Sequence, residues 1–154
     1  MIDNLRNAKE ELKRADHLIY VSLKYTRTCD IFKSIIERLI NALDFIFNAM
    51  LKKLENEKKI SSIPSQPISK CNLVREKFND DIVKEVTDFY IWLRQVNKSP
   101  FNRLREFRRH VTMEVEIDGK KAEINIDNIT EYYKKTKVFF DYVEKIIKKE
   151  KEEK

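Results

Sequence analysis

The stretch "IFKSIIERLINALDFIFNAMLKKLE", residues 31–55, decides the fold. Its apolar side chains recur at helical spacing, but they cover an arc too wide for a helix with one solvent-facing side. A helix is therefore expected from a cap at Thr28 or Asp30 to about Lys58. Such a helix lies at the centre of a bundle and is also buried by a second subunit, so the sequence predicts a homodimer.

Helices are expected on both sides of this segment. The chain has one glycine and three prolines in 154 residues, so little interrupts helical structure. Apolar residues at helical spacing predict further helices over 3–25 and 73–97. Between them, the serine- and proline-rich stretch 60–71 is expected to form a loop inside the domain.

A β-hairpin interrupts the helical pattern at "VTMEVEIDGKKAEINI", residues 111–126. Apolar residues alternate on both sides of Asp118-Gly119, which suits a two-residue type I′ turn. The predicted register pairs Glu116 with Lys121 and Glu114 with Glu123.

The last helix follows the hairpin directly. Asp127 or Asn128 is expected to cap it, with Glu131 placed to complete a capping box on Asn128. Residues 149–154 are expected to form a frayed tail. The sequence thus predicts one domain over 1–154 that is mainly α, an up-and-down bundle of four to five helices with one β-hairpin inserted before the last helix.

Composition limits the classes of function. The net charge is +6 and the sequence pI is about 9.2, which permits nucleic-acid binding without requiring it. Cys29 and Cys71 lie far apart with no paired cysteines or Cys/His cluster, so no metal site is expected. The single glycine argues against a phosphate-binding glycine loop, and no cofactor is expected. Asp80 and Asp81 indicate a helix start rather than a metal site.

No part of the sequence is typical of a membrane span or an apolar signal segment. The two cysteines are expected to be free thiols in a reducing compartment. We therefore expect a cytoplasmic protein without a membrane partner.

The positive charge is concentrated in "FNRLREFRRH", residues 101–110, which hold four arginines against one glutamate. A helix is expected here, because Ser99 is a good cap and Pro100 is tolerated at the first helical position. An imidazole can take a proton from a ribose 2′-OH or give one to a leaving oxygen, and a guanidinium can hold a phosphate. The segment therefore has the groups that RNA cleavage needs.

Two arginines are candidates to act with His110. On an ideal helix Arg103, seven residues before His110, lies on nearly the same side, whereas Arg105 lies about 140° away. The sequence leaves the choice between Arg103 and Arg105 open. The further expected contacts to nucleic acid are Arg108 and Arg109.

The order of helices, the basic Arg…His segment and the final helix resemble the HEPN superfamily of helical bundles. Its motif, an arginine followed after four to six residues by a histidine, matches "REFRRH" with Arg105 and His110, and "RLREFRRH" with Arg103 and His110. The resemblance implies a metal-independent endoribonuclease whose motif lies at a dimer interface. It also implies a toxin whose partner is a nucleotidyltransferase-type antitoxin. Glu106 departs from the motif, because a carboxylate after Arg105 would repel phosphate.

Two non-catalytic interpretations stand beside the ribonuclease. The arginines can form a salt-bridged face of a scaffold bundle, with His110 interacting with the helix dipole. They can also bind RNA or DNA without cleaving it, in which case affinity falls steeply with salt.

Overall fold

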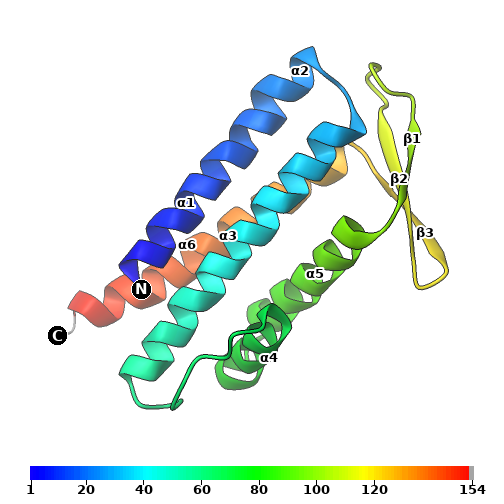
Figure 1. Ribbon diagram of the computed structural model, residues 1–154. Coiled ribbons are helices and arrows are strands. Elements are labelled where there is room, and N and C mark those ends of the chain that lie inside the picture. The colour runs from blue at the N-terminus through cyan, green and yellow to red at the C-terminus, as the bar shows by residue number, and fades with distance from the viewer. Residues whose placement is uncertain (153–154) are drawn as a thin grey trace.

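The computed structural model describes residues 1–152, which form a mainly α fold with a small antiparallel sheet before the last helix (Figure 1). The long helices are α1 (Ile2–His17), α3 (Cys29–Asn56), α4 (Pro67–Phe78), α5 (Asp81–Lys98) and α6 (Ile126–Glu152). A π-helical turn, η1 (Leu18–Ser22), and the short α2 (Leu23–Tyr25) extend α1. The strands are β1 (Phe101–Leu104), β2 (Thr112–Ile117) and β3 (Lys120–Ile124), in the order β1-β2-β3.

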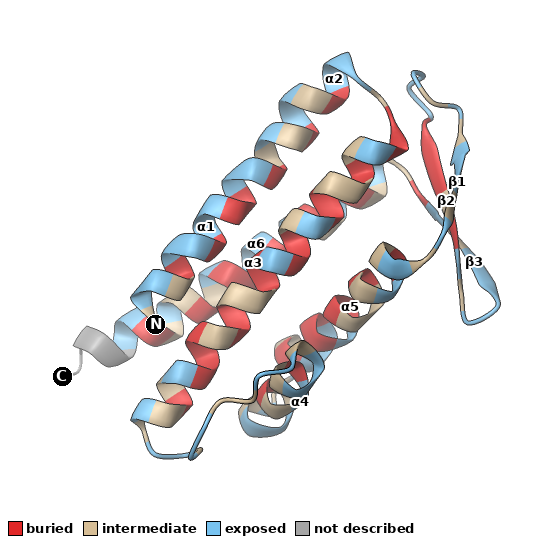
Figure 2. Ribbon diagram, in the orientation of Figure 1, coloured by how far each residue is buried: buried red, intermediate tan, exposed pale blue. Residues whose placement is uncertain are grey.

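The central helix of the bundle is α3, as its wide apolar arc predicts. It packs against α1, α4, α5 and α6 and also meets β2, so nearly all of its apolar side chains are buried (Figure 2). In α1, Ala8 and Ala15 are fully buried, and side chains this small let two helix axes approach closely. The chain itself thus covers the arc of α3. The width of that arc does not require a second subunit, and the homodimer stays a prediction.

The predicted single helix over 73–97 is wrong, because two helices occupy this region. The backbone turns at Asn79, and the Asp80 carboxylate accepts a hydrogen bond from the Val83 N–H at 3.0 Å, which caps α5. The helix start at Asp80 and Asp81 is therefore confirmed. The predicted loop over 60–71 is shorter than expected, because α4 begins at Pro67, where a proline loses no helical hydrogen bond.

The β-hairpin is confirmed together with its register. Asp118 and Gly119 both have positive φ, 52° and 78°, as a type I′ turn requires. Glu116 pairs with Lys121 and Glu114 pairs with Glu123.

The predicted helix over 101–110 is wrong. Its first residues form β1, which pairs antiparallel with β2 through Phe101 opposite Val115 and Arg103 opposite Met113. Ser99 ends α5 instead of starting a new helix, in the extended conformation that a residue before proline prefers. The apolar residues of this segment have helical spacing, but the free edge of β2 offers its backbone hydrogen-bond partners. These hydrogen bonds stabilise a strand in place of a helix.

The predicted caps of the last helix are also wrong. Asn125 and Asn128 exchange hydrogen bonds, each side-chain oxygen accepting from the other residue's backbone N–H at 2.8 and 3.2 Å. Asn125 is thus the cap, and Asn128 takes the reciprocal role expected of Glu131. Where the sequence predicts a frayed tail over 149–154, α6 continues to Glu152, and residues 153 and 154 lie outside the described part of the chain.

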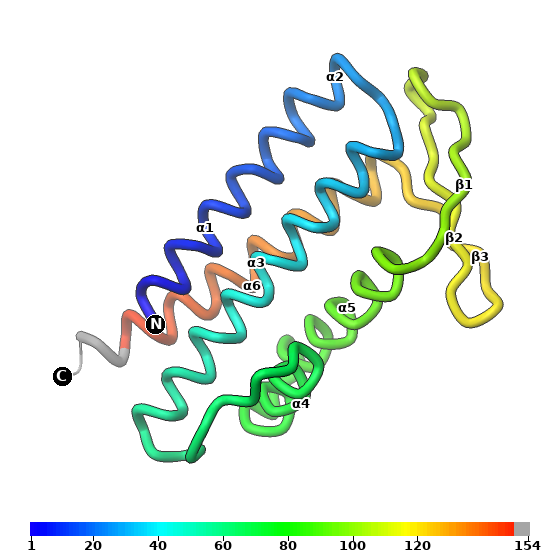
Figure 3. Tube along the Cα trace, viewed as in Figure 1, coloured from blue at the N-terminus to red at the C-terminus, as the bar shows by residue number. Residues whose placement is uncertain are grey.

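The sheet lies at one end of the bundle, and the start of α1 lies toward the other end (Figure 3). Among the described residues, no helix has the length and apolar character needed to cross a membrane.

Candidate functional site

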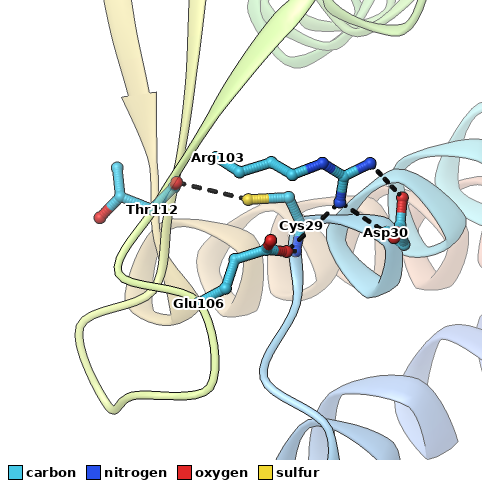
Figure 4. Close-up of polar contacts among 5 residues, drawn as sticks. All are labelled: Cys29, Asp30, Arg103, Glu106 and Thr112. Carbon is cyan, nitrogen blue, oxygen red and sulfur yellow. Dashed lines mark hydrogen bonds and ion pairs between the residues drawn. The ribbon is translucent and has the colours of Figure 1, made fainter.

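The loop between β1 and β2 is fixed to the start of α3. The Glu106 carboxylate accepts a hydrogen bond from the Cys29 backbone N–H at 2.9 Å (Figure 4). One residue later, the Phe107 N–H donates to the Arg27 carbonyl at 2.7 Å. Thr28 occupies the N-cap position of α3, as predicted, but its side chain makes no capping hydrogen bond. Glu106, far along the sequence, accepts from the first helical N–H instead.

Arg103 also connects the sheet to α3. Its guanidinium makes two hydrogen bonds of 2.9 Å to the Asp30 carboxylate and a longer one of 3.3 Å to Glu106 (Figure 4). It also lies over the Phe101 ring, 5.0 Å from its centroid. The hydrogen bond from Arg103 lowers the pKa of Asp30. The negative charges of Asp30 and Glu106 are thus both compensated by Arg103. The charge of Glu106 also interacts favourably with the N-terminus of α3.

A buried thiol supports the same junction. Cys29 is fully buried, and its Sγ donates to the Thr112 carbonyl at 3.3 Å (Figure 4). Burial, followed by the charge of Glu106, raises the pKa of this thiol. The Thr112 hydroxyl in turn donates to the His110 carbonyl at 2.9 Å, which fixes the backbone on which the imidazole is carried.

Beside this junction is a pocket of about 710 Å³. The segment before α3, the β1–β2 loop, the hairpin strands and the start of α6 all contribute to its wall. It is lined by Arg27, Arg105, Arg109, His110, Thr112, Glu123, Asn125, Ile126 and Asp127.

The pocket carries more cationic than anionic side chains. Three arginines and one histidine line it together with the two acids Glu123 and Asp127. Across residues 1–149 the arginines at 27, 105 and 109 form no ion pair, and Arg27 Nε is buried without a hydrogen-bond partner. These guanidinium groups can therefore bind an anionic ligand, and a phosphate suits their planar donors.

The structure separates the two arginines that the sequence left as alternatives. Arg105 and His110 line the same pocket, together with Arg109, whereas Arg103 is held by Asp30 outside it. Arg108 is exposed and does not line the pocket. The helical angles that favoured Arg103 do not apply, because residues 105–110 form a loop in which Arg105 has a φ of 54°.

Sequence reasoning missed three charged residues of the pocket. When the predicted hairpin register is continued beyond the strands, His110 lies opposite Asp127. Glu123 lies near the same end of the hairpin, so the register already indicated that both acids would be close to His110. Arg27 had no local signal, because its position depends on the contact between its carbonyl and Phe107.

The comparisons with known proteins add no assignment: no protein-family model, curated protein or solved structure matches this chain. Within the described residues, no group of three or more His, Cys, Asp or Glu side chains is arranged to hold a metal ion. The pocket residues themselves therefore carry the functional proposal.

Proposed function

We propose that this chain is a HEPN-like endoribonuclease that cleaves RNA at the pocket without a metal ion. The observation that carries the proposal is the joint presence of His110, Arg27, Arg105 and Arg109 around one cavity. The reaction needs groups that transfer protons and cations that stabilise charge on the phosphate, and the pocket is lined by both kinds.

In the proposed reaction, the ribose 2′-oxygen attacks the adjacent phosphorus. A 2′-O–P bond forms while the 5′-O–P bond breaks, which gives a 2′,3′-cyclic phosphate and a 5′-hydroxyl. One pocket group takes the proton of the 2′-OH, and another gives a proton to the leaving 5′-oxygen. His110 can serve at either step, and the carboxylates of Glu123 and Asp127 are the other proton-transfer groups at the pocket. The arginines hold the phosphate and stabilise the charge that grows on its oxygens.

The HEPN resemblance supports Arg105 as the partner of His110. These two residues follow the shorter spacing of the motif and lie at the same pocket. Glu106, the departure from the motif, is bound to Cys29 N and Arg103, so its charge is already compensated. A homodimer, a nucleotidyltransferase-type antitoxin and a cytoplasmic location rest on the sequence and the resemblance, and belong to the same proposal.

The direct test is cleavage of RNA in EDTA by the purified protein and by His110→Ala. Loss of a general acid or base lowers rates by about 10²- to 10⁴-fold, and we expect a loss of that size. The matched control is His17→Ala, because His17 is exposed on α1 and does not line the pocket. It should cleave like the unchanged protein, with 2′,3′-cyclic phosphate ends on the products.

Equal cleavage by His110→Ala and the unchanged protein would contradict the proposal, as would RNA that stays intact with both. In the second case the pocket arginines still allow RNA binding without cleavage, which Arg105→Ala would weaken. A protein that neither cleaves nor binds RNA would instead be a scaffold, and its partner would be sought by copurification.

A further inference from the structure

Two exposed aromatic residues belong to the two segments that carry the pocket arginines. Tyr25 is 84% exposed and Phe107 is 75% exposed, more than any other large hydrophobic side chain in the described residues. Single exposed apolar residues are common on protein surfaces and need no explanation. Here, however, the two come from segments far apart in the sequence that meet at one end of the bundle.

The contact that joins these segments is specific. The Phe107 N–H donates to the carbonyl of Arg27, which follows Tyr25 by two residues, at 2.7 Å. The adjacent hydrogen bond from Cys29 N to Glu106 fixes the loop at a second point. The backbone that carries Phe107 is thus held against the segment between α2 and α3, and its ring is exposed to solvent.

The backbone of Phe107 adopts an unfavourable conformation. Its φ is 66°, in the left-handed region that bulky residues rarely occupy. Arg105, at the start of the loop, has a φ of 54°. Because the Phe107 ring is exposed, burial of the ring does not offset the cost of this backbone conformation. Backbone outliers of this kind concentrate at functional sites.

Arginines are close neighbours in sequence of both aromatic residues. Arg105, Arg108 and Arg109 flank Phe107 in the loop, and Arg27 follows Tyr25. Aromatic side chains beside guanidinium groups bind single-stranded nucleic acid, because unpaired bases stack on the rings while the phosphates meet the cations. Bases of a duplex are already stacked on one another and cannot use such rings.

We propose that Phe107 and Tyr25 form a stacking platform that delivers an unpaired RNA segment to the pocket. This inference rests on the proposed function, because it needs the pocket to receive an RNA phosphate. It adds the substrate class: single-stranded RNA, with bases on the two rings and the backbone at the arginines.

The test separates binding from cleavage. The probe is a labelled, unstructured 2′-O-methyl oligoribonucleotide, which lacks the attacking hydroxyl, and its affinity is measured by fluorescence anisotropy. We expect Phe107→Ala and Tyr25→Ala each to weaken binding by about 5- to 150-fold, the effect of losing one stacked base. Phe107→Tyr should bind like the unchanged protein, since the ring is retained. The same sequence in a duplex should bind weakly and should not respond to these changes.

The control is Val138→Ala, which shortens another exposed apolar side chain, 60% exposed on α6. It should leave affinity unchanged. If both aromatic variants bind the oligonucleotide normally while His110→Ala abolishes cleavage, the platform is refuted and the nuclease stands. If the aromatic variants lose binding but the protein cleaves nothing, the platform stands and the nuclease fails. If they alter only self-association in sedimentation, the platform is refuted in favour of a contact between copies.

Discussion

Arg103 and Arg105 are two residues apart, yet the fold gives them different surroundings. Arg103 lies on β1, where its guanidinium binds Asp30 with two hydrogen bonds of 2.9 Å. Arg105 begins the loop and lines the pocket without an ion pair in the described structure. Arg103 is therefore a positioning residue that holds the sheet to α3, and Arg105 is available to a ligand.

The ion pair between Arg103 and Asp30 predicts how the pKa of the Asp30 carboxyl responds to a substitution. Its pKa is lowered in the folded protein by the hydrogen bond from Arg103, so Arg103→Ala should raise that pKa toward its ordinary value. A carboxyl whose pKa is lowered on folding contributes stability above its unfolded pKa of about 3.9, and that contribution is lost as the pH falls through the folded value. The variant should therefore lose less stability on acidification. NMR titration of the Asp30 carboxyl measures the shift.

The matched control for this titration is Arg108→Ala. Arg108 lies in the same loop, is exposed and forms no ion pair among the described side chains. Its removal should leave the Asp30 curve in place. An unchanged curve in Arg103→Ala would show that the ion pair does not form in solution.

Among the elements, the hairpin was predictable and β1 was not. The hairpin is specified locally, because alternation and the Asp118-Gly119 turn together fix the register. The segment 101–104 carries helical spacing and becomes a strand only because β2 offers it an edge. The same limit applies to the cap of α3, since Glu106 is brought there by the loop rather than by sequence proximity.

The turn of the hairpin predicts how a substitution at Gly119 changes the stability of the protein. A Cβ added at Gly119 would meet nothing within 4 Å, but its φ of 78° disfavours every residue with a side chain. Gly119→Ala should therefore cost about 1–2 kcal/mol in the free energy of unfolding, from backbone conformation alone. Urea denaturation followed by circular dichroism measures it. Asp118→Gly changes the neighbouring position, whose φ is 52°, and should not destabilise the protein in the same experiment.

In the whole molecule, the pocket forms where segments far apart in the sequence meet. Its wall combines Arg27, the loop 105–110 and the strand–helix junction at 123–127. The sequence indicated the basic loop and the histidine, and the hairpin register placed the two acids near them. The position of Arg27 required the packing of α1 on α3, which brings the end of α2 to the sheet. Tertiary packing, not a local motif, therefore completes the site.

The placement of charge in the whole molecule predicts how RNA binding depends on salt. The net charge of +6 is not decisive by itself, because only arginines that contact phosphates release counterions. If Arg27, Arg105 and Arg109 each neutralise one phosphate of a single strand, log affinity should fall with log salt with a slope of about −2. Arg105→Ala should make that slope shallower by about 0.7.

Arg6→Ala is the matched control, because it removes an equal charge from the opposite end of α1, about 25–30 Å from the pocket along that helix. Its affinity should differ little and its slope should equal that of the unchanged protein. Equal losses of slope in the two variants would mean that RNA responds to overall charge rather than to the pocket. A slope that Arg105→Ala alone reduces would place phosphates at the cavity that holds His110, whether or not the strand is then cleaved.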